Sequence, residues 1–412
     1  MSNIKPFKCM RPSQEMASTI AALPYDVYDR AEAYEEVKKH PQSFLAIDRP
    51  ETQFDLECDM YAPRMYEKAK EMLDDWLHKG WFIEDNEESY YVYAETMGER
   101  TQRGIVAVAS IDDYLNNIIK KHENTRADKE LDRIHHVDTC CAQTGPIFLA
   151  YRPNETLKNI INQVILRTPL YAFTSSDGIK HEVWKMNQDE NKKVYETFQA
   201  IPELYIADGH HRCASAVKVG VKRREEHPGF TGQEEFNFFM SVIFSEDELK
   251  IYDYNRIVKD LNGLTKEEFL DKINQAGFKT TPIKKETYPQ AKGYMSMDLM
   301  GDWYSIQMDD SIKSNDSVKG LDVSILQDYL LDPILGIKDP KVDKRINFVG
   351  GIRGLKELTK KVNEGYAVAF AMYPTSLDEL FKVADEGRLM PPKSTWFEPK
   401  LRSGLFIHKF EK

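Results

Sequence analysis

The sequence predicts a mixed α/β protein built as two lobes. Segments with the hydrophobic spacing of amphipathic helices alternate with short apolar runs that are typical of strands. Two pairs of these runs are separated by glycine-containing turns, which indicates antiparallel hairpins. A further apolar run, 204–207, passes through Asp208-Gly209 into a helix start. With 412 residues the chain has room for about two or three domains and a substantial core.

Helix caps, prolines and turn glycines set the expected elements of the N-terminal half. Asp29 and Glu32 have the spacing of a capping box, and Pro63 and Gly80 stand where a helix begins and ends. The expected elements are a helix over 30–39, a helix from Pro63 to Gly80, a hairpin of 90–96 and 104–110, a helix over 111–121, a strand over 146–151, a helix over 154–166, a hairpin of 171–174 and 179–186, and a helix over 190–199.

The C-terminal half alternates in the same way. Residues 222–229 combine charged side chains with a Pro-Gly turn, so we place the boundary there, between a lobe of residues 1–230 and a lobe of residues 231–412. The expected elements are a strand over 236–244, a helix over 265–276, an antiparallel meander over 278–308, a helix over 322–335 interrupted by Pro333, a strand over 346–349, a helix over 354–363, a strand over 367–373 and a helix over 377–384.

The composition is that of a globular protein and argues against several functions. The 67 acidic residues outnumber the 56 lysines and arginines, and the formal net charge of −11 disfavours broad binding to nucleic acid. The sequence has no apolar run of about 18 residues, so no membrane span is expected. Residues 1–8 lack the apolar core of a signal peptide. Five cysteines without zinc-site spacing fit free thiols in a reducing cytoplasm.

The segment 204–216 carries the strongest functional signal. Backbone N–H groups at a helix start are unpaired and attract anions, and Gly209 lets the backbone approach a ligand closely. Arg212 can bind phosphate or carboxylate oxygens through two nitrogens at once. We therefore expect a phosphate-binding turn, with Asp208 placed to bind a metal, a hydroxyl group or a proton. The alternative is an ordinary strand-to-helix turn whose two histidines are structural.

A second polar stretch runs from Lys120 to Arg126 and is predicted to be a loop after a helix. In it, His122 and Glu123 are candidates for a base or a metal ligand. Arg126 and the later Arg133 are candidates for binding an anion. The alternative is a solvated helix end whose lysines complement the helix dipole.

Two further stretches carry weaker signals. The turn Pro24-Tyr25-Asp26 is either the wall of a pocket or a simple entry into the helix that follows. In the tail, Lys393, Ser394 and Thr395 form a compact cluster of donors suited to phosphate. The alternative for the tail is a closing strand with exposed polar residues.

Together, these motifs resemble the family called domain of unknown function 1015, and the resemblance covers nearly the whole chain. It assigns the family but no reaction, because the family has no firmly assigned activity. The motifs are Pro24-Tyr25-Asp26-Val27, Lys121-His122-Glu123-Asn124-Thr125, Asp208-Gly209-His210-His211-Arg212, and Pro391-Pro392-Lys393-Ser394-Thr395 with Pro399-Lys400.

The turn that begins at Asp208 is also similar to the phosphate-binding turn of the ParB-like and sulfiredoxin-like superfamily. That superfamily includes partition proteins that bind cytidine triphosphate, sulfiredoxins, and kinases that phosphorylate free serine. The resemblance implies a core of that fold, elaborated with additional sheets and helices. It also implies that Asp208 helps at the reacting centre and that phosphates are held by Gly209, His210, His211 and Arg212.

The chain departs from these relatives at two positions. Sulfiredoxins carry a cysteine directly after the turn glycine, where this chain has His210, so sulfiredoxin chemistry is not expected. The serine kinases also use a glutamate from a segment before the turn. Glu123 is the residue that we assign as its substitute.

The combined prediction is a nucleotide-dependent phosphotransferase acting on a small hydroxylated metabolite, with free serine or phosphoserine as candidates. The expected cofactors are Mg²⁺, with Asp208 as a ligand, and ATP or ADP. The expected catalytic residues are Asp208, Glu123 and His122. The expected phosphate- or nucleotide-binding residues are Gly209, His210, His211, Arg212, Lys393, Ser394 and Thr395. The expected substrate pocket contains Tyr25, Asp26, Arg126 and Lys400.

Two other functions remain open at this point. A metal-dependent hydrolase, such as a phosphatase acting on a phosphoserine-like substrate, would use Asp208 and nearby histidines. Against it, adjacent residues on a helix point about 100° apart, so His210 and His211 are poorly placed to share one metal. A non-catalytic nucleotide-binding regulator would use the same turn. Neither nucleic acid nor a membrane is an expected partner.

Overall fold

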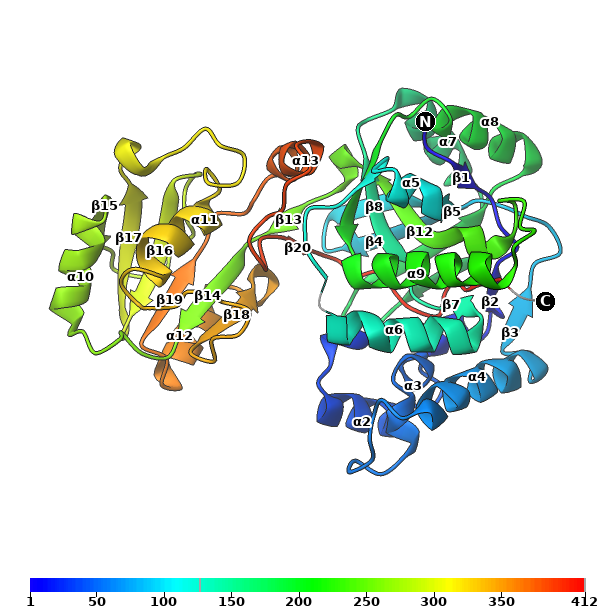
Figure 1. Cartoon of the computed structure of the whole chain (residues 1–412), viewed down its shortest axis with the longest axis horizontal. Helices are drawn as coiled ribbons and strands as arrows, with labels where there is room; N and C mark the ends of the chain where they lie inside the picture. Colours follow the sequence, from blue (N-terminus) through cyan, green and yellow to red (C-terminus); the bar gives the residue numbers. More distant parts are fainter. Residues whose placement is uncertain (126, 411–412) are drawn as a thin grey trace. The chain divides into compact units, whose positions relative to one another are not determined.

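The chain forms two compact units, coloured along the sequence in Figure 1. The computed structural model describes residues 1–125 and 127–410. The first unit contains Met1–Leu249 and Pro399–Lys412, and the second contains Lys250–Glu398. The second unit is therefore inserted between two segments of the first. The division differs from the expected boundary near residue 230 because β12 (Phe238–Ser245) pairs inside the sheet of the first unit.

A mixed sheet lies at the centre of the first unit, and its described strands follow the order β6-β11-β8-β12-β5-β4-β10-β9, with β1 paired to β5. β11 runs parallel to β6 and β12 runs parallel to β8, whereas the other pairs are antiparallel. The strands are β1 (Ile4–Lys5), β4 (Tyr91–Met97), β5 (Arg100–Ser110), β6 (Ile119–Lys120), β8 (Ile147–Tyr151), β9 (Tyr171–Thr174), β10 (Lys180–Lys185), β11 (Leu204–Asp208) and β12.

Hydrophobic burial explains the order of this sheet. β12 is an almost continuous apolar run and is buried at all eight positions, because β5 and β8 flank it. The hairpins β4–β5 and β9–β10 confirm the two predicted from glycine turns. Two short strand pairs lie outside the main sheet, β2 (Met10–Pro12) with β3 (Phe82–Glu84), and β7 (Ala142–Gln143) with β21 (His408–Lys409).

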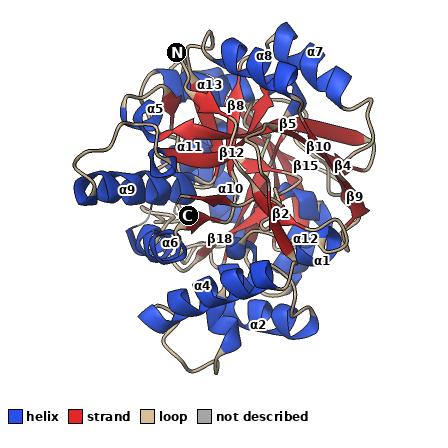
Figure 2. Cartoon of the chain, turned by 90° about the vertical axis from the view of Figure 1, so that its right-hand side faces the viewer, coloured by secondary structure: helices blue, strands red, loops and turns tan. Residues whose placement is uncertain are grey.

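Helices cover the sheet of the first unit (Figure 2). α6 packs against α9 on one side and against α4 on the other. The capping box of Asp29 and Glu32 starts α2 as predicted, and Pro63 is the first residue of α4. The helices are α1 (Ala17–Ile20), α2 (Arg30–Lys39), α3 (Leu45–Asp48), α4 (Pro63–His78), α5 (Ile111–Leu115), α6 (Ala127–Cys140), α7 (Glu155–Val164), α8 (Gln188–Phe198) and α9 (His210–Glu226).

The segment before the second polar loop differs from the prediction. The helix expected over 111–121 ends at Leu115, and Asn117 adopts a left-handed conformation with φ of 58°. The chain then forms β6, which pairs with β11. The helix after this loop was not predicted: α6 begins at Ala127 and packs against α4 and α9.

The second unit is built on an antiparallel sheet with the order β15-β17-β16-β19-β14-β18. Its strands are β14 (Tyr254–Val258), β15 (Phe278–Pro282), β16 (Tyr294–Leu299), β17 (Asp302–Met308), β18 (Ile346–Gly350) and β19 (Val368–Ala371), and β13 (Ile251–Tyr252) pairs separately with β20 (Trp396–Phe397). Its helices are α10 (Lys266–Gln275), α11 (Asp322–Leu326), α12 (Leu355–Asn363) and α13 (Leu377–Asp385).

Two predictions for the second unit need correction. β15 pairs with β17 rather than with its sequence neighbour β16, so residues 278–308 are not a simple meander. The helix expected over 322–335 is α-helical only through α11 and continues as a short π-helix over 327–331. Across both units, no helix of the described residues is long and apolar enough to span a membrane.

Candidate functional site

The two polar loops predicted to be functional leave the sheet at the same edge. β6 runs parallel to β11, with Leu204 opposite Ile119 and Tyr205 opposite Lys120. Parallel strands end at the same edge of a sheet, and ligands of α/β proteins commonly bind beyond these ends. The loop that begins at Lys121 therefore lies beside the turn that begins at Gly209.

Gly209 and Arg212 shape the turn together. Gly209 has φ of 90° and immediately precedes the 17-residue helix α9. A Cβ atom on Gly209 would lie 3.2 Å from both Nε and Nη2 of Arg212, so the guanidinium is folded back over the glycine. Arg212 Nη1 also donates a hydrogen bond to the carbonyl of Pro146. The turn thus combines a guanidinium with the unpaired N–H groups of a helix start, which together favour an anion.

Asp208 is held as a carboxylate by its neighbours. Lys400 Nζ donates to Oδ2 at 2.8 Å, and the N–H of Gly209 donates to Oδ1 at 2.7 Å. Burial by itself would raise the pKa of Asp208, but the charges of Lys400 and Arg212 and these two hydrogen bonds outweigh it and lower that pKa. Asp208 is therefore ionised at neutral pH.

His122 and His210 form a buried pair at the same edge. Their ring centroids are 4.5 Å apart with the planes at 88°, an edge-to-face contact. Burial lowers the pKa of His122 to about 4, against the opposing effects of the Ile206 backbone and Asp208. Burial, reinforced by the charge of His122, lowers the pKa of His210 well below its usual value. Both rings are therefore neutral at pH 7 and bind through hydrogen bonds rather than through charge.

Two details of this pair bear on ligand binding. Glu123 Oε2 lies 4.0 Å from His210 Nδ1, and the Glu123 side chain is 34% exposed. His210 Nε2 is buried and has no hydrogen-bond partner among the described residues. A buried polar atom without a partner is costly, and a ligand that supplied one would remove this cost.

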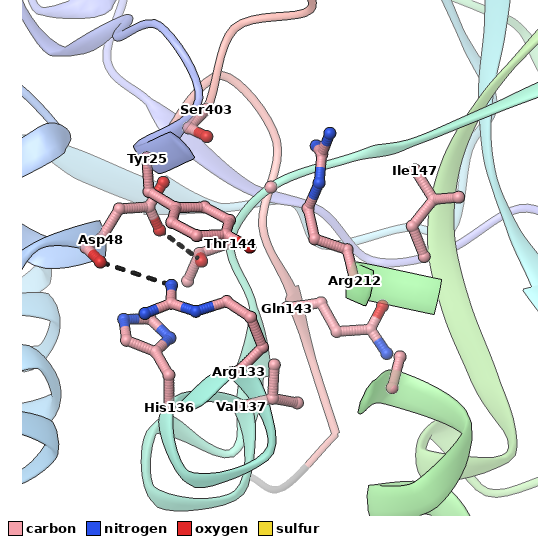
Figure 3. A pocket seen from close by; sticks show the side chains of 12 residues that line it. Tyr25, Asp48, Arg133, His136, Val137, Gln143, Thr144, Ile147, Arg212 and Ser403 are labelled. Atoms are coloured by element: carbon pink, nitrogen blue, oxygen red, sulfur yellow. Dashed lines mark hydrogen bonds between the residues drawn. The ribbon is translucent and has the colours of Figure 1, made fainter. Parts of the chain in front are cut away.

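Arg212 also lines a small cavity of about 30 Å³ (Figure 3). The ring of Tyr25 lies over the Arg133 guanidinium, whose Cζ is 4.2 Å from the ring centroid. Arg133 also donates to the carbonyl of Asp48 at 3.3 Å, while the Asp48 carboxylate accepts from Thr144 Oγ1 at 2.8 Å. Arg133 and Arg212 thus line one cavity, and Figure 3 shows both among its walls.

The structure places most of the predicted site residues in the first unit. Asp208, Gly209, His210, Arg212, His122 and Glu123 lie at the edge where β6 and β11 end. His211 is the second residue of α9 and contributes its carbonyl to a hydrogen bond from Ser215 at 2.8 Å. Tyr25 and Asp26 line a neighbouring cavity. Arg126 lies outside the described residues.

The predicted tail residues divide between the units. Lys400 belongs to the first unit and contacts Asp208 there, instead of lining the cavity beside Tyr25 and Asp26. Lys393, Ser394 and Thr395 belong to the second unit. Within it, the carbonyl of Lys393 accepts from Arg256 at 3.1 Å and Ser394 Oγ donates to the Pro391 carbonyl at 2.7 Å. Their phosphate-binding role stays a prediction.

Sequence reasoning missed the partners of two candidate site residues. It did not pair Lys400 with Asp208, and it did not place Arg133 on a helix against Tyr25. The signal for the helix was present, since Ala127–Cys140 has no proline or glycine and its apolar residues recur at helical spacing. No local signal pointed to the first pair, whose members are 192 residues apart.

The contacts of Asp208 are those of a carboxylate bound to an ammonium group rather than to a metal ion. Lys400 and the N–H of Gly209 engage both oxygens of Asp208, which was the predicted metal ligand. Within residues 1–125 and 127–410, no three His, Cys, Asp or Glu side chains are grouped as ligands for one metal ion. A divalent cation at Asp208 would have to displace Lys400.

The family model described as "Protein of unknown function (DUF1015)" matches residues 4–324. The chain belongs to this family. The match to DUF1015 spans the whole arrangement of β6, β11 and α9, while the tail that supplies Lys400 lies beyond it. No curated protein matches the chain.

Several solved structures share a partial likeness with this DUF1015 protein. A free serine kinase in complex with AMP has a TM-score of 0.37 at 15% identity, covering 73% of this chain and 91% of that one. SbnI with a C-terminal truncation, from Staphylococcus aureus, has a TM-score of 0.37 at 11% identity, with coverages of 71% and 82%. A conserved hypothetical protein from Pyrococcus furiosus has a TM-score of 0.34 at 16% identity, with coverages of 71% and 90%.

Proposed function

We propose that this protein is a nucleotide-dependent phosphotransferase that acts on a small hydroxylated metabolite, with free serine or phosphoserine as the first candidates. The observation that supports it best is the parallel pairing of β6 with β11. This pairing puts a partly exposed carboxylate, Glu123, beside the anion-binding start of α9. Phosphoryl transfer needs these two parts close together, one to orient the nucleophile and one to neutralise charge.

The start of α9 would hold the phosphates. Its first N–H groups have no partner within the helix, and Arg212 adds a fixed positive charge above Gly209. His210 would add a neutral hydrogen bond, because its buried Nε2 has no partner among the described residues. A neutral donor suits a phosphate oxygen that already faces a guanidinium, since no extra charge has to be buried.

The two carboxylates would have different roles. A group that accepts a proton works best when its pKa lies near the working pH, and the pKa of Asp208 is lowered far from that range. Asp208 would therefore keep Lys400 and the N–H of Gly209 in place. Glu123 would orient the hydroxyl of the metabolite and take its proton as the phosphoryl group is transferred. His122 is neutral and would support the turn through its contact with His210.

A direct assay tests this function in both directions. The protein is incubated with ATP or ADP, Mg²⁺ and L-serine, and phosphoserine is followed by ³¹P NMR; the reverse assay starts from phosphoserine and ADP. Formation of phosphoserine or of ATP is the expected result. Phosphate release from phosphoserine without nucleotide would indicate a hydrolase instead. Nucleotide binding without turnover of any hydroxylated metabolite would indicate a regulator.

The variant Glu123→Gln tests the assigned nucleophile-orienting group. Loss of a general base lowers turnover by about 10²- to 10⁴-fold, so we expect a decrease of that size with unchanged nucleotide affinity. Glu87→Gln is the matched control, because Glu87 is an exposed glutamate of the same unit outside the site. Equal activity of the two variants would remove Glu123 from the reaction.

A further inference from the structure

A second, larger cavity of about 220 Å³ lies in the first unit where the turn at Tyr25 meets the starts of α2 and α6. This volume is well above the roughly 10–15 Å³ that one water molecule needs, so the cavity has room for a molecule of several heavy atoms. Charged side chains and tyrosines form most of its wall. The charges in this wall determine what kind of molecule would fit.

Most of these charges are already paired within the protein. Arg133 Nη2 contacts Asp132 Oδ2 at 2.7 Å, and Arg49 Nε contacts Glu51 Oε1 at 2.6 Å. The carboxylate of Asp29 caps α2 by accepting the N–H of Glu32. These five side chains therefore give the wall its shape and leave little charge for a ligand.

Three charged side chains of the wall are outside these contacts, Arg30, Asp26 and Lys129, and the last two are exposed. Arg30 Nη2 donates to the carbonyl of Cys58 at 2.6 Å, but its Nε is buried and has no hydrogen-bond partner among the described residues. Within the same residues, no carboxylate lies in ion-pair distance of Arg30, and the carboxylate of Asp26 has neither an ion pair nor a hydrogen bond. Arg30 and Asp26 thus face one cavity without pairing with each other.

We infer that this cavity binds a small zwitterion, a molecule that carries one carboxylate and one ammonium group. Arg30 would bind the carboxylate, because a guanidinium with a buried, unsatisfied N–H gains most from a charged acceptor. Asp26 would bind the ammonium. A molecule with only one of the two charges would leave the other side chain unpaired, so it would bind more weakly. α-Amino acids have this pair of charges at the required small size.

The position of the cavity connects this inference to the proposed reaction. Tyr25 and Arg133 line both this cavity and the smaller one that contains Arg212. Glu123 precedes the start of α6 by four residues in the sequence, and the first turns of α6 supply Lys129 and Arg133 to the wall. The role of the zwitterion as phosphoryl acceptor rests on the proposed function, whereas its binding does not.

Calorimetry without nucleotide tests the binding alone. The twenty protein L-amino acids are titrated first, and the tightest is then compared with its decarboxylated amine and with its analogue that lacks the amino group. We expect the amino acid to bind about 10- to 100-fold more tightly than either analogue, the usual effect of a lost charge-assisted pair. Absence of binding by every amino acid would overturn the inference.

Substitutions in the cavity assign each charge to its partner. Arg30→Gln should remove the preference for the amino acid over the amine, and Asp26→Asn should remove the preference over the analogue without the amino group. Lys129→Gln is the matched control, since Lys129 is an exposed cation of the same wall, and it should preserve both preferences. Equal weakening of all three ligands by Arg30→Gln and Asp26→Asn would contradict the assignment.

A failure of this inference differs from a failure of the proposed function. Glu123→Gln should lower phosphoryl transfer by about 10²- to 10⁴-fold. It should preserve the preference for the amino acid over its amine and over the analogue without the amino group, because Glu123 is not part of the cavity wall. Amino-acid binding without any phosphoryl transfer would support the cavity and refute the phosphotransferase. Transfer to an acceptor that lacks one of the two charges, with equal efficiency, would refute the cavity and support the phosphotransferase.

Discussion

Gly209 meets two requirements at once, a left-handed backbone and room for a neighbouring guanidinium. Its φ of 90° is strained for any residue with a Cβ atom, and such an atom would lie 3.2 Å from Arg212. Few other positions in the first unit combine these conditions. Gly98, in the turn between β4 and β5, has φ of 59° but nothing within 4 Å of an added Cβ. Substituting each glycine in turn therefore separates the effect of backbone strain from the effect of displacing Arg212.

We predict that Gly209→Ala destabilises the protein by about 1–3 kcal/mol and weakens nucleotide binding. Gly98→Ala should cost a similar amount of stability from its backbone alone and leave nucleotide binding intact. Urea unfolding and nucleotide titration of both variants measure the two effects. If Gly98→Ala weakened nucleotide binding as much, the loss would come from stability and not from the position of Arg212.

At the scale of single residues, the succession of signals along the sequence identified the turn but not the residues that pack around it. Asp208, Gly209 and Arg212 stood out because strand, turn and helix signals follow one another directly. The neutral state of His122 and His210 was not predictable, because it depends on burial by segments that are distant in sequence. The sequence predicted a catalytic role for His122 and phosphate binding for His210, and the structure adds that burial lowers the pKa of both.

At the scale of elements, the returning tail links the turn to the rest of the first unit. Lys400 contacts Asp208, Arg402 pairs with Asp177 after β9, and Ser403 bridges to Ala22 near the start of the chain. The tail thus contacts the end of β11, the turn between β9 and β10, and the segment at Ala22. Its loss would release the carboxylate of Asp208 beside the turn at Gly209.

A double-mutant cycle measures the contact between the tail and the turn. We predict a coupling free energy of about 1 kcal/mol between Lys400→Met and Asp208→Asn, because both side chains are partly shielded from water. The exposed pair of Asp75 on α4 and Lys79 directly after it, treated in the same way, should give about 0.3–0.5 kcal/mol. Equal couplings would mean that the contact with Asp208 is only a surface ion pair.

The hairpin β9–β10 carries a buried histidine that makes stability depend on pH. His181 contacts Tyr93 Oη at 2.8 Å and Ser175 Oγ at 2.9 Å, and it is fully buried. Burial and the charge of Arg402 lower the pKa of His181 to about 3. Between pH 3 and pH 6.5 the unfolded chain binds a proton that the folded state excludes, so acid favours unfolding.

We predict that wild-type stability falls as the pH drops from about 6.5 towards 3, and that His181→Gln makes this fall less steep. One such group contributes a slope of up to about 1.4 kcal/mol per pH unit. The amide of glutamine keeps a donor and an acceptor for Tyr93 and Ser175. Urea unfolding at several pH values is the measurement, and His40→Gln, on an exposed histidine after α2, is the control. An unchanged slope in His181→Gln would assign the pH dependence to other groups.

Elements with local boundary signals were predictable, and elements defined by distant pairing were not. α2 and α4 follow from their caps, and β12 follows from its apolar run. β6 has only two residues and exists because β11 lies beside it, so no local pattern announces it. That short strand is nevertheless what brings Glu123 to the turn.

At the scale of the whole molecule, the second unit is inserted into the first, and residues of the first unit on both sides of the insertion contact β5. The Glu248 carbonyl accepts from Arg100 and the Pro399 carbonyl accepts from Gln102, both residues of β5. Residues two apart on a strand are separated by about 7 Å. The boundary predicted near residue 230 does not describe this arrangement. The chain returns to the first unit at Pro399, and the composition of the sequence does not mark that return.

We predict that replacing residues 250–398 with a linker of about four glycine and serine residues leaves the first unit folded. The two ends already lie close together, so a short linker spans them without strain. Circular dichroism and calorimetry should show one cooperative unfolding transition and a contribution of Lys400 to stability equal to that in the full chain. A product without a cooperative transition would show that the first unit depends on the second.

The separation of Lys400 from Asp208 by 192 residues also constrains how the protein is made. Ribosomes add about 5–20 residues per second, so the turn waits roughly 10–40 seconds for its ammonium partner after it has been synthesised. During this interval the carboxylate of Asp208 lacks Lys400 and keeps only Arg212 of the two cations that lower its pKa, while the inserted unit emerges and folds. Assembly of the candidate site where β6 and β11 end is therefore among the last events of biosynthesis, and a chain released before residue 400 would lack the contact between Lys400 and Asp208 however well its sheet had formed.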